Sequence, residues 1–235
     1  MVSAVLGWND PSHRCALGAA EVHAWLASLD VAPSVAARLA RTLADEERTR
    51  AARFRNDADQ RRFTVARGVL RAIMASYLGV PSSAVRFAAG IHGKPELAPP
   101  DSGDAPCRDI TFNVAHSGEL ALYAIARRRQ VGVDIERVDA TTDIEALGRR
   151  FFSEAEQSSL RSLEGQRRRA AIYRSWTHKE AYLKARGVGL LLPLDSLDAG
   201  HWTLMDLPVG PDYVAALATE GAPLSVRLWR WRETQ

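Results

Sequence analysis

Apolar residues recur at helical spacing in a segment of the first half of the chain. Residues 57–78 place the following on one face: Phe63, Ala66, Leu70, Ile73, Met74, Tyr77 and Leu78. Asp57 and Gln60 stand at the spacing of a capping box, and Gly79 and Pro81 end the pattern. We therefore predict one long amphipathic helix here.

Three further segments have helical patterns. An Ala/Arg-rich region from about Ser34 to Phe54 is predicted to be helical. Ser153 and Glu156 have capping-box spacing, which indicates the start of another helix. A longer helix is expected from about Gln166 to Arg186, because Gly187 follows it directly.

Apolar runs between these helices predict the strands. Leu120–Ala126 and Val131–Val138 are separated by a polar turn, so we expect them to form an antiparallel pair. Further strand candidates are Ala4–Trp8, Val214–Ala218 and Ser225–Trp231. The stretch from Gly90 to Pro106 is rich in Pro and Gly, so it is predicted to be a long loop without regular structure.

The order of these elements repeats faintly. A strand, helices, a long helix ended by Gly and further strands occur once before about residue 128 and once after it. Strands do not alternate regularly with single helices, as a doubly wound sheet requires. We expect an α+β fold of two similar subdomains, residues 1–128 and 129–235, related by a pseudo-twofold axis, each with an antiparallel sheet and helices.

Composition places the chain among ordinary folded proteins. It has 235 residues, of which 46% are hydrophobic and 25% charged, and its formal net charge is +3. Because no apolar run is long enough to span a membrane and no secretory signal is evident, we expect a cytoplasmic protein without a membrane partner. Cys15 and Cys107 are too few for a disulfide framework. The interspersed charges are weak grounds for a nucleic-acid partner.

The basic residues are unevenly divided between the two types. Lys and Arg together number 31, yet the lysines are only Lys94, Lys179 and Lys184. Lysine is a compact ammonium on a flexible stem, whereas arginine is a planar fork, so a site that needs the former resists exchange. The three lysines are therefore candidate functional residues, although chance survival would give the same count.

Two carboxylates share one face of a predicted strand. In the run from Val131 to Glu136, apolar residues alternate with Asp134 and Glu136, and Gly132 precedes them on the same face. Carboxylate oxygens at this separation suit Mg²⁺ or Mn²⁺ together with substrate phosphate oxygens. A solvated acidic strand face would show the same pattern.

The long second helix strengthens the metal interpretation. Glu180 falls in the apolar stripe marked by Tyr173, Trp176 and Leu183, so its carboxylate is aimed inward. An exposed ion pair with Lys184, one turn later, does not explain that direction. An inward carboxylate flanked by Lys179 and Lys184 suits a diphosphate bound with Mg²⁺.

Two other segments carry polar groups suited to phosphate. His116 and Ser117 directly precede a strand and can donate to a phosphate oxygen, but a histidine in an ordinary turn looks the same. Gly93-Lys94-Pro95 combines a permissive glycine, a cation and a stiff exit, and it also has the composition of an ordinary turn. The usual glycine-rich nucleotide loops are absent from the sequence.

Together these motifs resemble those of the Sfp-type 4′-phosphopantetheinyl transferases. The resemblance rests on Gly132-Val133-Asp134-Ile135-Glu136 and, some forty residues later, the run from Trp176 to Gly187. Gly93-Lys94-Pro95 and the run from Phe112 to Ser117 match the two upstream motifs of that family, in the same order. The similarity spans roughly residues 40–195. It implies two similar α+β halves with one active site between them.

The resemblance also implies an activity. Such an enzyme binds Mg²⁺ and coenzyme A and transfers 4′-phosphopantetheine to a serine of an acyl or peptidyl carrier protein of fatty-acid, polyketide or nonribosomal-peptide synthesis, releasing adenosine 3′,5′-bisphosphate. The metal ligands it implies are Asp134, Glu136 and Glu180. The residues it implies at phosphates or the nucleotide are Lys94, Pro95, His116, Ser117, Lys179, Lys184 and Arg50. Glu136, Glu180 or a metal-bound water would take the serine proton.

Several positions depart from the family pattern. Ala115 replaces the serine that precedes the histidine in the family motif. Arg50 is the best match for a cation at the 3′-phosphate, Glu47 stands where some relatives carry Lys, and the match of Arg62 is uncertain. Glu156 matches an acidic position near the metal, but its helix-cap spacing is already a sufficient explanation.

Two other functions fit parts of the pattern. A Mg²⁺-dependent nuclease could use the three carboxylates, but the carboxylate-x-Lys pattern common in such sites is not made here, where Arg137 follows Glu136 and Ala181 follows Glu180. A noncatalytic module that binds carrier proteins would not need inward metal ligands. Because the motifs are split between the halves, we expect a monomer with one site per chain.

Overall fold

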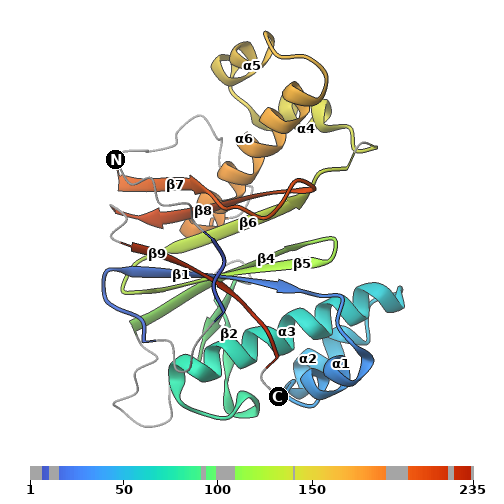
Figure 1. The fold of residues 1–235 in the computed structure, drawn as a ribbon, viewed down its shortest axis with the longest axis vertical. Coiled ribbons are helices and arrows are strands. Elements are labelled where there is room, and N and C mark those ends of the chain that lie inside the picture. The colour runs from blue at the N-terminus through green and yellow to red at the C-terminus, as the bar shows by residue number, and fades with distance from the viewer. Residues whose placement is uncertain are drawn as a thin grey trace.

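The computed structural model describes residues 7–10, 16–90, 94–98, 109–139, 141–188, 201–221 and 225–233, and Figure 1 shows the fold. The α-helices within these ranges are α1 (Pro33–Ala40), α2 (Asp45–Ala51), α3 (Asp57–Leu78), α4 (Ile144–Phe151), α5 (Glu154–Leu160) and α6 (Gly165–Arg186), and Ser82–Ala84 form a 3-10 turn, η1. The strands are β1 (Glu21–Ser28), β2 (Phe87–Ala89), β3 (Pro95–Leu97), β4 (Ile110–Ser117), β5 (Leu120–Arg127), β6 (Val131–Arg137), β7 (Trp202–Asp206), β8 (Tyr213–Glu220) and β9 (Ser225–Arg230).

Two sheets lie face to face in the centre of the molecule (Figure 1). The first has the strand order β4-β5-β1-β9, and the second has the order β6-β8-β7. Helices α1–α3 lie on the outer side of the first sheet, and α6 lies on the outer side of the second (Figure 1). The short strands β2 and β3 form a separate hairpin. The predicted α+β class is confirmed.

Apolar side chains fill each space between these layers. Tyr123 and Ile125 of β5 face α3, whereas Leu122 of the same strand faces the second sheet and packs with Val133 and Leu217. Because β5 is buried on both faces, its sequence is a continuous apolar run rather than an alternating one. The two halves therefore share a core, with the second sheet pressed against the first.

The bounds of the two long helices, α3 and α6, agree closely with those predicted from the sequence. Gly79 ends α3 and Gly187 ends α6, with φ of 69° and 67°, the left-handed conformation that favours glycine at a helix end. The N-cap of α3 is Asn56 rather than Asp57, because the Asn56 side chain accepts the Ala58 N–H at 2.7 Å. The capping box of Ser153 and Glu156 at the start of α5 is confirmed.

The predicted pairing of β5 with β6 is wrong. Both strands exist, but β5 already bonds to β4 on one edge and to β1 on the other, so it has no edge left for β6. The turn between them instead carries the chain to the second sheet, where β6 pairs with β8. Arg128 in this turn has φ of 55°, and its N–H donates to Asp109 O at 2.7 Å.

Two other expectations need correction. The region from Ser34 to Phe54 forms two short helices, because the chain turns after Arg41 and restarts where the Ala44 N–H donates to the Glu47 carboxylate. The stretch from Gly90 to Pro106 is not wholly irregular, since β3 pairs antiparallel with β2. A strand as short as β3, and beginning with Pro95, has too few residues to show alternation.

The terminal segments return to the first sheet. β9 appears where a strand was expected, but it runs parallel to β1 and not within the second sheet. Asn9 makes one isolated bridge to Trp229, while residues 4–6 of the strand predicted for Ala4–Trp8 lie outside the described residues. Cys15, Gly93 and Cys107 also lie outside them. The division of the chain at residue 128 stays a prediction.

No helix in the described part of the chain has both the length and the apolar character needed to cross a bilayer.

Candidate active site

Two carboxylates of β6 point away from the shared core, as the alternation predicted. Val131, Val133 and Ile135 pack between the sheets, whereas Asp134 and Glu136 face the opposite side, toward α6. The exposed fraction of Asp134 is 3%. An anion this deeply buried requires a partner of opposite charge.

Gly132 allows α6 to lie directly on this strand. A Cβ atom at this position would stand 2.1 Å from Ala181 O and 2.4 Å from Ala185 N, so any side chain would push the helix away. The close approach brings Lys184 to Asp134, with Nζ 2.6 Å from Oδ1. Asp134 and Lys184 are thus joined across the interface of strand and helix.

The three predicted metal ligands influence one another electrostatically. Burial raises the pKa of Glu180, Lys184 opposes this, and the charges of Asp134 and Glu136 raise the pKa further. The pKa of Glu136 is likewise raised by burial and by Asp134. For Asp134, the effect of burial exceeds the opposing effect of Lys184. When the three carboxylates are ionised, the single positive charge of Lys184 does not balance them, and the site has an excess of negative charge.

This donor set fits a divalent cation by its chemistry. Asp134 Oδ2 is buried and has no hydrogen-bond partner, so one carboxylate oxygen is available to a ligand. Hard oxygen donors and surplus negative charge are what Mg²⁺ requires. The side chains as positioned do not form a ready cluster, because no group of three or more potential ligands among the described residues meets metal-site spacing.

Residues from before position 128 hold these carboxylates in place. Ser117 Oγ donates to Glu136 Oε2 at 2.9 Å, and Ser117 Oγ in turn accepts the Arg137 N–H at 3.0 Å. Asn113 Oδ1 accepts the Val133 N–H at 2.9 Å. Ser117 was predicted at a phosphate, and the structure places it against a carboxylate. The sequence analysis gave Asn113 no role, although its place in the family-like motif could have drawn attention to it.

A histidine and two cations from different elements lie beside the carboxylates. His116 stands at the exposed end of β4, and partial withdrawal from water, Lys184 and Arg50 together lower its pKa. A lowered pKa favours the neutral imidazole, which can still donate one hydrogen bond. The structure thus brings His116, Arg50 and Lys184 near one another, as a site for phosphates requires.

A basic cavity adjoins Arg50. Its volume is about 450 Å³, and it lies between α2, α3 and the β2–β3 hairpin. Arg50, Arg67 and Arg86 line it, as do Pro95 and Phe87. The guanidinium of Arg67 lies 5.3 Å from the centre of the Phe87 ring and 5.9 Å from that of Phe63. Arg67 was not singled out from the sequence, since one more arginine in an arginine-rich chain carries no signal.

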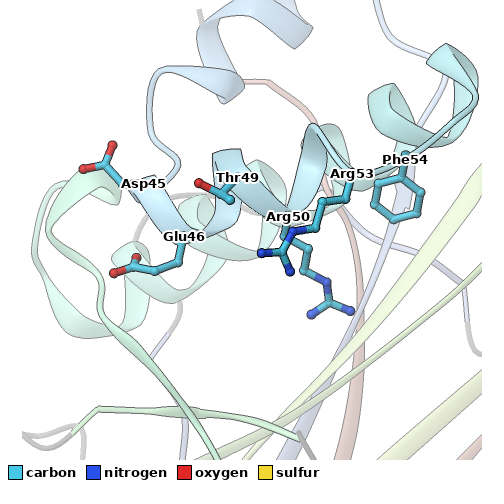
Figure 2. A pocket seen from close by; sticks show the side chains of 6 residues that line it. All are labelled: Asp45, Glu46, Thr49, Arg50, Arg53 and Phe54. Atoms are coloured by element: carbon cyan, nitrogen blue, oxygen red, sulfur yellow. The ribbon is translucent and has the colours of Figure 1, made fainter.

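Arg50 also borders a second, shallower hollow on the outer side of α2. Figure 2 shows that Arg50 and Arg53 extend from the helix in the same general direction, with Phe54 beyond them. Asp45 and Glu46 stand at the other end of this hollow (Figure 2). The arginine end is the part suited to an anion.

The other two lysines are engaged with the protein itself. Lys179 is buried and its Nζ lies 2.7 Å from Glu156 Oε2, on a different face of α6 from Glu180. Lys94 Nζ donates to the backbone carbonyls of Lys184 and Ala185. The phosphate contacts predicted for Lys94 and Lys179 stay predictions.

The positions that departed from the family pattern have defined partners. Glu47 pairs with Arg71 at 2.7 Å and lies 3.6 Å from Arg67, so it neutralises part of the basic cavity. Arg62 pairs with Glu119. Burial opposes a lowered pKa at Glu156, but Lys179 and the Ser153 N–H outweigh it and lower that pKa.

Comparison with known proteins identifies the family. The profile of the 4′-phosphopantetheinyl transferase superfamily matches residues 130–232, and a profile for the N-terminal part of 4′-phosphopantetheinyl transferases matches residues 31–128. The chain is 38% identical over 224 residues to the 4′-phosphopantetheinyl transferase HetI of Nostoc sp., covering 90% of this chain and 92% of that protein.

Two more distant relatives have the same activity in their names. The 4′-phosphopantetheinyl transferase Sfp of Bacillus subtilis is 31% identical over 154 residues, which is 66% of this chain and 64% of Sfp. The L-aminoadipate-semialdehyde dehydrogenase-phosphopantetheinyl transferase of Xenopus laevis is 34% identical over 165 residues, covering 68% of this chain and 54% of that protein. The chain therefore belongs to the 4′-phosphopantetheinyl transferase superfamily and is an enzyme of that family.

Proposed function

We propose that this enzyme transfers the 4′-phosphopantetheine group of coenzyme A to a serine of an acyl or peptidyl carrier protein, with Mg²⁺ as its metal ion. The observation that carries the proposal is the electrostatic coupling of Asp134, Glu136 and Glu180 beside Lys184, with Asp134 Oδ2 buried and unpartnered. A diphosphate and a divalent cation together complement such a mixed set of anions and cations.

The first half supplies cations for the nucleotide end of coenzyme A. Arg50 borders both hollows beside α2, and Arg67 is held between two aromatic rings in the basic cavity. Guanidinium groups bind phosphate through paired N–H donors and stack on planar rings. This cavity is the place we assign to the nucleotide.

The second half supplies the groups for the transfer step. Asp134, Glu136 and Glu180 would hold Mg²⁺, which supplies positive charge to the diphosphate when bound. Lys184 places an ammonium beside Asp134, and His116 can donate to a phosphate oxygen from the opposite half. Ser117 orients Glu136 through its hydroxyl.

The chemical step is a phosphoryl-type displacement. The oxygen of the carrier serine forms a bond to the pantetheine-side phosphorus, and the bond from that phosphorus to the bridging oxygen breaks. Adenosine 3′,5′-bisphosphate leaves with the electron pair, and the serine proton passes to a carboxylate, Glu180 or Glu136. The raised pKa of both groups makes each a better proton acceptor than an exposed carboxylate.

The test is a mass measurement on intact carrier proteins. The enzyme is incubated with coenzyme A, Mg²⁺ and a panel of apo acyl and peptidyl carrier proteins, and the carriers are then weighed. We expect a covalent mass gain of one phosphopantetheine on at least one carrier, lost when Mg²⁺ is chelated. No gain on any carrier, together with Mg²⁺-dependent cleavage of DNA, would favour the nuclease alternative.

A further inference from the structure

Lys94 connects the two halves of the enzyme through a helix end. It directly precedes β3 in the first half, yet its Nζ donates to Lys184 O at 2.9 Å and to Ala185 O at 3.4 Å in the last turn of α6. The side chain is half-buried, and burial lowers its pKa. The Lys94 ammonium is therefore already hydrogen-bonded to the second half when no ligand is bound.

A cation near the last turn of an α-helix stabilises the helix. The last four carbonyls of an α-helix lack partners within the helix, and they carry the negative end of its dipole. At the end of α6 the chain turns away through Gly187, whose N–H lies 3.3 Å from Lys184 O. Lys94 supplies a shorter, charged hydrogen bond to the same carbonyl.

The carbonyl that Lys94 binds belongs to a residue of the active site. Lys184 uses its side chain to reach Asp134 Oδ1 at 2.6 Å, while its backbone oxygen is held by Lys94. Glu180 lies one helical turn earlier on the same face of α6. A shift of the last turn would therefore move Lys184 directly and would loosen the placement of Glu180.

A compact ammonium suits this position better than a guanidinium. Two acceptors on consecutive residues can be reached by a single point charge with three donors, whereas a planar fork requires acceptors in its own plane. The aliphatic part of the Lys94 side chain also lies against Gly187. Its Cδ atom is 3.9 Å from the point where a Cβ atom would stand if residue 187 had a side chain. This gives a physical reason for a lysine in a chain that otherwise uses arginine.

We propose that Lys94 is a positioning residue, which closes the C-terminal end of α6 and so sets Lys184 and Glu180 against the first half, and that it is not a phosphate ligand. The catalytic part of this inference rests on the function proposed above. The structural part does not, because the contact exists without coenzyme A.

The first experiment measures amide hydrogen exchange in the ligand-free enzyme. In Lys94→Met, the amides of the last turn of α6 should exchange at least about threefold faster than in the wild type, while those of α3 stay unchanged. The matched control is Leu97→Ala, which weakens the packing of the same hairpin but keeps the ammonium. Unchanged exchange in Lys94→Met, or equal acceleration in Leu97→Ala, would overturn the proposal.

The second experiment separates positioning from substrate binding. Lys94→Met should lower kcat about tenfold and leave the KM for coenzyme A within about threefold, because the lost contact is to the protein. A phosphate ligand would instead raise KM about tenfold or more at nearly constant kcat, which would contradict our proposal. If Lys94→Met does not fold, Lys94→Arg is used, and it should show the same two changes at smaller size.

The two proposals fail in different ways. If the wild-type enzyme transfers nothing to any carrier, the proposed function fails, whereas hydrogen exchange still decides whether Lys94 closes α6. If transfer is normal and exchange in the last turn does not respond to Lys94→Met, only the positioning role fails.

Discussion

Helices α3 and α6 are the same kind of element used for different chemistry. Each has 22 residues, each ends at a glycine with positive φ, and each lies against one of the two sheets. The last turn of α3 carries no basic residue, whereas that of α6 carries Lys184 and Arg186. Their ends are similar, and their charged side chains are not.

Helix α3 uses arginines in fixed surroundings. Arg71 is 1% exposed and donates to Glu47, Ser82 O and Val85 O, which ties α3 to α2 and to the segment before β2. Arg67 is framed by aromatic rings at the basic cavity. Planar cations in fixed surroundings suit the nucleotide-binding role that we propose for this cavity.

Helix α6 uses lysines paired with carboxylates. Lys184 meets Asp134, and Lys179 meets Glu156. The Lys184 pair lies among buried carboxylates whose charge must be balanced, whereas the Lys179 pair lies on another face of the helix. The comparison teaches that two helices of equal length carry different charge chemistry, which in the proposed function corresponds to nucleotide binding by the first half and transfer by the second.

The largest expected effect is the loss of a carboxylate from α6. Glu180→Gln should lower kcat by about a thousandfold, because it removes a metal ligand and a candidate base while keeping the side-chain volume. Arg50→Gln in the first half should instead raise the KM for coenzyme A about tenfold and keep kcat within about threefold. Steady-state kinetics at saturating Mg²⁺ measures both, and a kcat defect in Arg50→Gln equal to that of Glu180→Gln would break the division.

A second test compares the close approach of helix and neighbour in each half. Gly132→Ala should lower kcat about a hundredfold, because a Cβ atom 2.1 Å from Ala181 O must separate β6 from α6 and hence Asp134 from Lys184. Gly68→Ala places a Cβ atom 2.6 Å from Leu39 Cβ, where α3 meets α1. Each change should cost about 1–3 kcal/mol of unfolding free energy by overpacking.

Only the change at Gly132 should affect kcat strongly, since Gly68 lies against α1 and belongs to α3, which carries none of the three carboxylates. Denaturant unfolding and kinetics on the same preparations measure the two quantities. Equal kcat losses at equal destabilisation would mean that general loosening, and not the placement of α6, controls the transfer step.

A third test asks whether ammonium and guanidinium differ at the site. Lys184→Arg keeps the charge but replaces a point donor to Asp134 Oδ1 with a larger fork, so we expect kcat to fall about tenfold. Arg174→Lys is the matched change on an exposed face of the same helix, where Arg174 pairs with Asp206. It should leave kcat unchanged, and full activity in Lys184→Arg would mean that this site needs only a positive charge.

The smallest effect is on stability as a function of pH without Mg²⁺. The pKa of Glu180 is raised above 4.5 in the folded enzyme, so the folded state holds this proton more tightly than the unfolded chain does. Stability should therefore fall as pH rises from about 4.5 through the raised pKa. Glu180→Gln lacks this loss, so above that window it should be more stable than the wild type, by less than about 1.4 kcal/mol for each pKa unit of the shift because solvent screens this partly exposed carboxylate.

Urea unfolding of the wild type and Glu180→Gln between pH 4 and pH 8 measures the sign of the stability difference between them. The two curves should meet near pH 4 and separate as pH rises, and Mg²⁺ at pH 8 should narrow the gap by stabilising the wild type. Glu96→Gln removes an exposed carboxylate and should show no such separation. A variant that is less stable than the wild type at pH 8 would show that Glu180 is not strained by its neighbours.

Local signals in the sequence predicted the long helices and the faces of β6. Gly79, Gly187 and the Ser153–Glu156 capping box act within a few residues, so their meaning is local and can be read directly. Strict alternation placed Asp134 and Glu136 on one face because a strand has a period of two. The inward position of Glu180 likewise followed from helical spacing.

Partners across the fold could not be predicted in this way. An apolar run identifies β5 as a buried strand but not which strands bond to its edges, so β6 was assigned to it wrongly. The partners of Lys94 are backbone carbonyls some 90 positions away, and any residue type could supply them. The same limit applies to Lys179, whose partner Glu156 had been explained sufficiently as a helix cap.

The parallel pairing of β9 with β1 has a consequence for how the chain folds on the ribosome. β1 lies between β5 and β9, so one edge of β1 stays open until residues 225–230 have been synthesised. The chain must therefore be synthesised to at least residue 230 before the first sheet is complete, and until then that edge is a template for unwanted strand pairing. Contacts this distant in sequence slow folding. A nascent chain that stalls before β9 should be held by chaperones, whereas extension through β9 should release it.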